Sequence, residues 1–108
     1  MRRLILAGLL PYLAAGVCRA TADTERRLQI CAVCHESGAG GAPRIGRVAD
    51  WAPRLKSGMP ALIGSVKHGV PGTLMPGGSC RDCSDAQIEE LILRMSADSH
   101  NHSPLGNN

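Results

Sequence analysis

The chain has 108 residues, with 12 basic and 9 acidic side chains and a net charge of +3 at pH 7. Three of the basic residues and none of the acidic ones lie within positions 1–22, so the remainder is near neutral. The charge therefore gives no indication of a nucleic-acid or anionic-lipid partner. There is no Phe and only one Trp, which leaves little aromatic surface for the core of a small domain.

The segment 1–22 has the pattern of a secretory signal peptide. Two arginines precede an apolar stretch at 4–17, which is too short and too interrupted by proline to span a bilayer. The small residues at 20–22 form an A-x-A cleavage pattern. We expect cleavage after Ala22; cleavage after Ala20 or retention of the segment as a membrane tether are the alternatives. Removal would also take away Cys18, the odd fifth cysteine.

Residues 31–35 read Cys-Ala-Val-Cys-His, a run typical of c-type haem attachment. The thiols of Cys31 and Cys34 can add to the two vinyl groups of one haem, and His35 can reach the iron as an axial ligand. A short helix over 24–31, capped by Thr24, is expected to lead into this motif. The motif predicts one covalently attached haem c per chain.

The middle of the chain alternates between loops and short helices. Glycines at four positions predict a loop over 37–46, and a helical turn carrying Trp51 is expected at 49–56. A proline in the first position and a glycine after the end predict a helix over 60–68. Residues 70–79, rich in Gly and Pro, predict a second loop.

The last helix has the clearest signals. Ser84 and Gln87 have the spacing of a capping box. One apolar stripe at helical spacing follows: Ile88, Leu91, Ile92 and Met95. No strand alternation is evident, so we expect one small all-α domain over 23–97, after the signal peptide at 1–22. Residues 98–108 are polar and aperiodic, and we expect a disordered tail there.

A six-coordinate iron needs a second axial ligand, and the candidates are Met59, Met75, Met95, His68, His100 and His102. The stripe favours a core role for Met95, the polar tail favours solvated histidines, and the end of a helix suits His68 as a cation. Met59 opens a helix soon after the motif, whereas Met75 lies further along the chain in a proline-stiffened loop. Met75 is favoured, with core packing as the alternative for both methionines. A Met/His pair would leave no open position on the iron and suits one-electron transfer.

The stretches CAVCHESGAGGAPRIG, DWAPRL and LMPGGSCRDCSDAQIEELI resemble the small class I bacterial c-type cytochromes, specifically the cytochrome c-five subgroup. The resemblance implies a small cytochrome c fold with helices wrapped around one covalently attached haem. It implies Cys31 and Cys34 as thioether anchors and His35 and Met75 as axial ligands.

The resemblance also assigns roles outside the motif. Pro43 would offer its carbonyl to the second nitrogen of His35, which fixes a ligand's orientation. Trp51 would lie near a haem propionate, with Arg54 as a weaker propionate partner. Cys80 and Cys83 would form a disulfide.

These features predict an exported, periplasmic one-electron carrier that is not itself an enzyme. Its partners would be redox proteins such as membrane-bound reductases or terminal oxidases, docking transiently, with no nucleic acid. Peripheral membrane association and the oligomeric state are left open.

Two alternatives use the cysteines differently. A structural Cys₄ zinc module would use both C-x-x-C pairs, although the segment between them is longer than in a usual zinc ribbon and His35 would have no role. A thiol-disulfide oxidoreductase would need a βαβ pattern that the sequence lacks.

Overall fold

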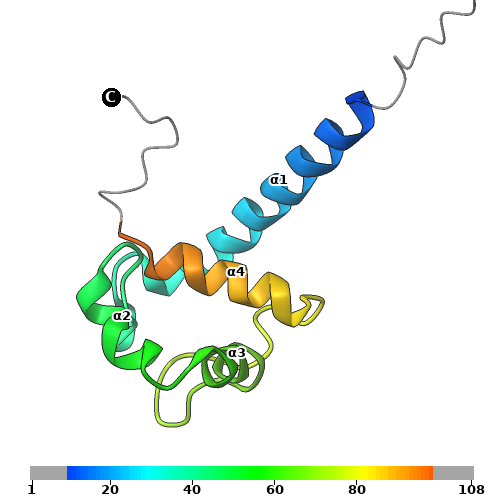
Figure 1. Ribbon diagram of the computed structural model, residues 1–108. Coiled ribbons are helices and arrows are strands. Elements are labelled where there is room, and N and C mark those ends of the chain that lie inside the picture. The colour runs from blue at the N-terminus through cyan, green and yellow to red at the C-terminus, as the bar shows by residue number, and fades with distance from the viewer. Residues whose placement is uncertain (1–9, 99–108) are drawn as a thin grey trace, which may run out of the picture.

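The computed structural model describes residues 10–98, which form four α-helices and one 3₁₀ turn without a strand (Figure 1). The all-α fold class is confirmed. The elements are α1 (Leu10–His35), η1 (Ala39–Gly41), α2 (Val48–Leu55), α3 (Met59–His68) and α4 (Asp85–Ser96). Residues 1–9 of the predicted signal peptide and 99–108 of the predicted tail, with His100 and His102, lie outside the described residues.

Helix α1 is much longer than the sequence pattern indicates. It begins at Leu10, and Thr24 is buried within it rather than capping its start, so the predicted boundary at Thr24 is wrong. From Ala14 onward the segment contains good helix formers and no proline, and nothing stops the helix at Thr24. The predicted cleavage position lies inside this helix, and cleavage there stays a prediction.

Helix α4 forms as its sequence predicts. The Ser84 hydroxyl accepts a hydrogen bond from the Gln87 backbone N–H at 3.2 Å, and the Gln87 side chain accepts one from the Ser84 N–H at 2.8 Å. The predicted capping box is therefore confirmed. The whole apolar stripe is buried: Ile88, Leu91, Ile92 and Met95.

The core lies between α3 and α4. Its buried centre is formed by Val66, Ile88 and Ile92. Partly buried side chains pack around that centre, namely Met59, Leu62, Ile63, Met75, Cys80 and Cys83. Both methionines that the sequence leaves as candidate ligands therefore contact one cluster.

Helix α4 connects the two ends of the domain, because it packs against both α1 and α3 (Figure 1). Arg94 of α4 forms an ion pair with Glu25 of α1. The Met95 carbonyl accepts a hydrogen bond from the Gly46 N–H at 2.9 Å, which ties the loop after α1 to α4. Within residues 10–98, no helix combines the length and the apolar character needed to cross a membrane.

Candidate functional site

His35 is the last residue of α1 and is only 8% exposed. Its Nδ1 lies 2.7 Å from the carbonyl oxygen of Pro43. Because a carbonyl can only accept, Nδ1 is the donor in this contact, and the tautomer of the neutral imidazole that fits it has its free electron pair on Nε2. A carbonyl partner of this kind fixes both the tautomer and the orientation of a metal-binding imidazole. His35 is thus prepared to bind a metal through Nε2.

The loop after α1 folds back toward the His35 imidazole. The Gly38 N–H donates to the Cys34 carbonyl at 3.0 Å, and the Ile45 N–H donates to the His35 carbonyl at 2.7 Å. These bonds fold residues 38–45 against the end of α1, and Pro43 is buried at the edge of the His35 ring. The Pro43 contact that the resemblance implies is therefore present, although its role toward a bound haem stays a prediction.

Trp51 of α2 packs directly on the His35 ring, with ring centroids 5.6 Å apart and planes 24° from parallel. Its side chain is 4% exposed. Its Nε1–H donates to the Arg44 carbonyl at 2.9 Å, which satisfies the one polar group of a buried indole. A propionate near Trp51 would compete with that carbonyl for the N–H, and the propionate role stays a prediction.

An ion pair holds the same loop to α2. The Arg44 Nε lies 2.8 Å from the Asp50 carboxylate, and the Arg44 backbone N–H donates to it at 3.1 Å. The Arg44 side chain and its N–H together lower the pKa of Asp50 to about 2. Sequence reasoning missed this pair, because the two residues are separated by a loop and have no helical spacing that would reveal it.

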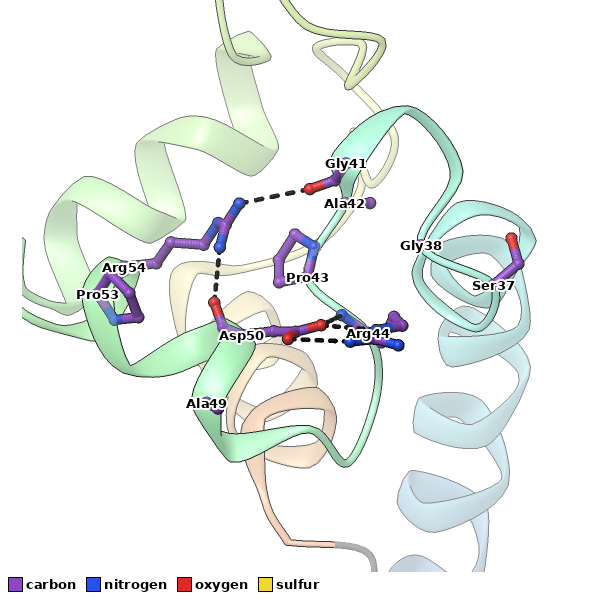
Figure 2. A pocket seen from close by; sticks show the side chains of 10 residues that line it. All are labelled: Ser37, Gly38, Gly41, Ala42, Pro43, Arg44, Ala49, Asp50, Pro53 and Arg54. Carbon is purple, nitrogen blue, oxygen red and sulfur yellow. Dashed lines mark hydrogen bonds and ion pairs between the residues drawn. The ribbon is translucent and has the colours of Figure 1, made fainter.

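A pocket of 410 Å³ lies between this loop and α2 (Figure 2). Arg54 reaches across it and donates to the carbonyls of Asp50 at 2.6 Å and Gly41 at 3.4 Å. In the view of Figure 2, Pro43 lies between the Arg54–Gly41 contact and the Arg44–Asp50 pair, which joins α2 to the loop. Two of the five guanidinium N–H donors of Arg54 are thus engaged, and the others can take part in binding an anionic group.

The two motif cysteines lie in the last turns of α1. Cys31 and Cys34 are half-buried and are not disulfide-bonded. Residues three apart on a helix are surface neighbours, so both thiols lie next to the same helix end as His35. Burial raises the pKa of the Cys31 thiol, which keeps it protonated at neutral pH. Two unpaired thiols and a prepared imidazole are the donor set that a covalently attached haem requires.

Met75 lies in the loop between α3 and α4 and is half-buried against the core. Met59, at the first position of α3, contacts the same cluster. Met95 is buried in the stripe of α4, as its spacing predicts, and His68 is exposed at the end of α3. The choice of Met75 as axial ligand stays a prediction.

The second C-x-x-C pair lies apart from the first. The Cys80 and Cys83 sulfurs are paired, and their Cα atoms are 5.3 Å apart, within the range of a disulfide. The Arg27 guanidinium lies 3.4 Å and 3.2 Å from these sulfurs and 2.9 Å from the Asp82 carboxylate. Among the described residues, the group of side chains close enough to hold a metal ion is Cys80, Asp82 and Cys83. It does not include the motif cysteines. This separation speaks against a Cys₄ zinc site.

Known proteins resemble the chain over most of its length. Residues 23–93 match the family model for cytochrome c oxidase, cbb3-type, subunit III. The chain is 40% identical over 86 residues to a cytochrome c-555 of Chlorobaculum tepidum, covering 76% of this chain and 72% of that protein. It is 37% identical over 68 residues to cytochrome c5 of Ectopseudomonas mendocina, covering 61% and 77%. A cytochrome c-555 of Chlorobaculum thiosulfatiphilum is 36% identical over 85 residues, covering 76% and 91%.

Proposed function

Because the chain belongs to the cytochrome c family, as a small class I c-type cytochrome with one covalently attached haem c, we propose that it is an exported one-electron carrier with His/Met axial ligation. Membership of the cytochrome c family supports a role in electron transfer rather than in catalysis. The observation that carries the proposal is the buried His35, whose Nδ1 is hydrogen-bonded to the Pro43 carbonyl at 2.7 Å. The unpaired thiols of Cys31 and Cys34 precede it on the same helix.

In this proposal the chain's residues have separate tasks. Cys31 and Cys34 anchor the haem through thioether bonds, while His35 Nε2 and the Met75 thioether take the axial positions. The haem iron supplies the one-electron redox couple when bound. With both axial positions filled by the chain, no site is left for oxygen or a substrate.

Neighbouring groups of the main chain and the side chains keep the imidazole fixed during electron transfer. The Pro43 carbonyl holds the Nδ1 proton, which keeps Nε2 available to the iron. The Trp51 ring covers the imidazole and excludes water from it. A ligand held in this way changes little in position between oxidation states, which favours rapid transfer of one electron.

The remaining assignments follow from the sequence pattern. The signal-peptide pattern at 1–22 supports a periplasmic location, with membrane tethering as the outcome if the segment is retained. In an oxidising compartment Cys80 and Cys83 would form a stable disulfide. Partners would be redox proteins such as membrane-bound reductases or terminal oxidases, docking transiently over a small interface.

The first test is covalent haem retention. The chain is expressed with a c-type maturation system, denatured, and examined for haem that stays with the polypeptide. Retention is expected for the parent, and the Cys31→Ser, Cys34→Ser double variant should lose it. A colourless parent that binds zinc would instead support the Cys₄ module.

The second test addresses the axial ligand. Met75→Ala should abolish the long-wavelength absorption band that arises from methionine-sulfur-to-iron charge transfer in the ferric protein. Met59→Ala is the matched control, because Met59 contacts the same core cluster, and it should keep the band. If Met75→Ala keeps the band and Met59→Ala loses it, the axial assignment is reversed.

A further inference from the structure

Two glycines bring the ends of the Met75 loop together. Gly69 follows α3, and Gly77 lies two positions after Met75. A Cβ placed on Gly77 would lie 2.7 Å from the His68 carbonyl carbon and 2.9 Å from its oxygen. A Cβ placed on Gly69 would lie 2.8 Å from the Gly77 nitrogen and 2.9 Å from the Met75 oxygen. At this point the two segments pass with backbone against backbone, which only glycine permits.

Hydrogen bonds close the loop on both sides of this contact. The Gly78 N–H donates to the Lys67 carbonyl at 3.0 Å, and the Val70 N–H donates to the Met75 carbonyl at 3.2 Å. Inside the loop, the Thr73 hydroxyl donates to the Val70 carbonyl at 2.7 Å and accepts from the Met75 N–H at 3.2 Å. Both backbone polar groups of Met75 are therefore fixed by residues of its own loop.

Side-chain packing gives this loop little support. Residues 71–74 are exposed, and Met75 itself is only half-buried. An unbranched methionine also has several rotatable bonds and adapts to different surroundings. The position of the Met75 backbone, and with it the reach of the sulfur, thus depends on the closure of the loop.

We propose that the Gly69–Gly77 contact positions Met75 as an axial ligand of the haem. The inference rests on the proposed assignment of Met75 and adds two residues outside the proposed set of ligands. A ligand site needs its supporting residues to hold the ligating atom within about half an ångström. A side chain at Gly77 would push apart the backbone that holds Met75 and open the axial position.

Gly77 offers the sharper test of the two glycines. Its φ is not positive, so an alanine there adds close contact without backbone strain. Gly72, in the same loop, has a φ of 75° and nothing within 4 Å of an added Cβ, so Gly72→Ala adds strain without contact. Gly64→Ala, inside α3, adds neither.

The experiment uses the haem-loaded protein in the ferric state. Gly77→Ala should weaken or abolish the methionine-to-iron charge-transfer band and lower the midpoint potential. It should also bind added imidazole about tenfold more tightly, because apparent affinity follows the fraction of molecules with an open axial position. Gly64→Ala should match the parent in all three measurements, and Gly72→Ala should keep the band. A Gly77→Ala protein with the parent's band, potential and imidazole affinity would overturn the proposal, even if its stability fell.

A less disruptive variant keeps the proposal testable if Gly77→Ala does not fold. Thr73→Val removes the hydroxyl that binds Val70 and Met75 but leaves an exposed side chain of similar size. It should weaken the band and raise imidazole affinity in the same direction as Gly77→Ala. If Gly77→Ala gives no folded protein, an unchanged Thr73→Val overturns the proposal by itself.

The failure of this inference is distinct from the failure of the axial assignment. If Met75→Ala keeps the charge-transfer band, Met75 is not the ligand and both proposals fall. If Met75→Ala loses the band while Gly77→Ala and Thr73→Val keep it, the axial assignment stands and only the role of the glycine contact falls.

Discussion

The two proposed axial ligands are held in opposite ways. His35 is buried at the end of a long helix and is fixed by a carbonyl from the following loop and a ring from α2. Met75 is half-buried in an exposed loop and is fixed through its own backbone. In the comparison, the rigid imidazole is held by contacts to its own ring, whereas the flexible thioether depends on where its main chain is held. It also predicts which substitutions will disturb the His35 site and which will disturb the Met75 loop.

Trp51→Ala should have the largest effect, because it removes a buried ring from the His35 side. Loss of a buried aromatic side chain typically lowers the free energy of unfolding by about 3–5 kcal/mol. Chemical denaturation of the haem-loaded protein would measure this loss. Trp51→Phe keeps a ring on the imidazole and should lose clearly less. A Trp51→Ala protein as stable as the parent would mean that the stack does not support His35.

Removing the Cys80–Cys83 pair should have the next largest effect, on the segment that follows the Met75 loop. The proposed disulfide would close a very short loop, which constrains the unfolded chain by about 2 kcal/mol in the chain-entropy model. The double variant Cys80→Ala, Cys83→Ala should unfold at lower denaturant and keep the charge-transfer band. Parent protein treated with a dithiol reductant should behave in the same way, and a band lost in both would show that the pair helps to position Met75.

Asp50→Asn should have a smaller effect that depends on pH. The folded pKa of about 2 lies below the ordinary value of a carboxyl, because Arg44 favours the charged form. The pair therefore stabilises the fold above about pH 4 and loses this contribution as the pH falls through about 2. Melting temperatures between about pH 2 and 5 should fall less steeply in the variant than in the parent.

A second ion pair and a control variant provide the comparison for the pH experiment. Arg27 also lowers the pKa of Asp82, so part of the acid sensitivity should survive in Asp50→Asn. Glu89→Gln, exposed on α4, is the matched control and should retain the parent's pH dependence. Equal slopes for Asp50→Asn and the parent would contradict the role of the Arg44–Asp50 pair.

Leu74→Ala should have the smallest effect. Leu74 is 73% exposed beside Met75, and surface substitutions of this kind usually change stability by no more than about 0.5 kcal/mol. Thermal unfolding and the charge-transfer band should both match the parent. A loss well above this range would show that side-chain packing does support the Met75 loop, and the contrast with His35 would weaken.

The parts of this fold that could be predicted from sequence depend on local signals. Ser84 and Gln87 lie within one helical turn of each other. The helical spacing of the apolar residues that follow indicates that they share one buried face. The haem-attachment motif is equally local. The start of α1 could not be found in this way, because Thr24 is a suitable cap residue in a segment where the helix simply continues.

The contacts that complete the site are non-local. Trp51 belongs to a different helix from His35 and meets it only because the loop between them turns back. Arg27 of α1 reaches Asp82, in the segment just before α4, and no spacing rule indicates such a partner. The closeness of Gly69 and Gly77 is hidden for a different reason, since glycines in a loop rich in Gly and Pro are already explained by turn formation.

The packing of α1 against α4 has a consequence for biosynthesis. The attachment motif at the end of α1 is translated well before Asp85, the first residue of the helix that packs against α1. Until α4 emerges, Glu25 has no Arg94 to pair with and Gly46 has no Met95 carbonyl to bind. Before α4 has formed, the thiols of Cys31 and Cys34 therefore lie on a helix that lacks its contacts with α4.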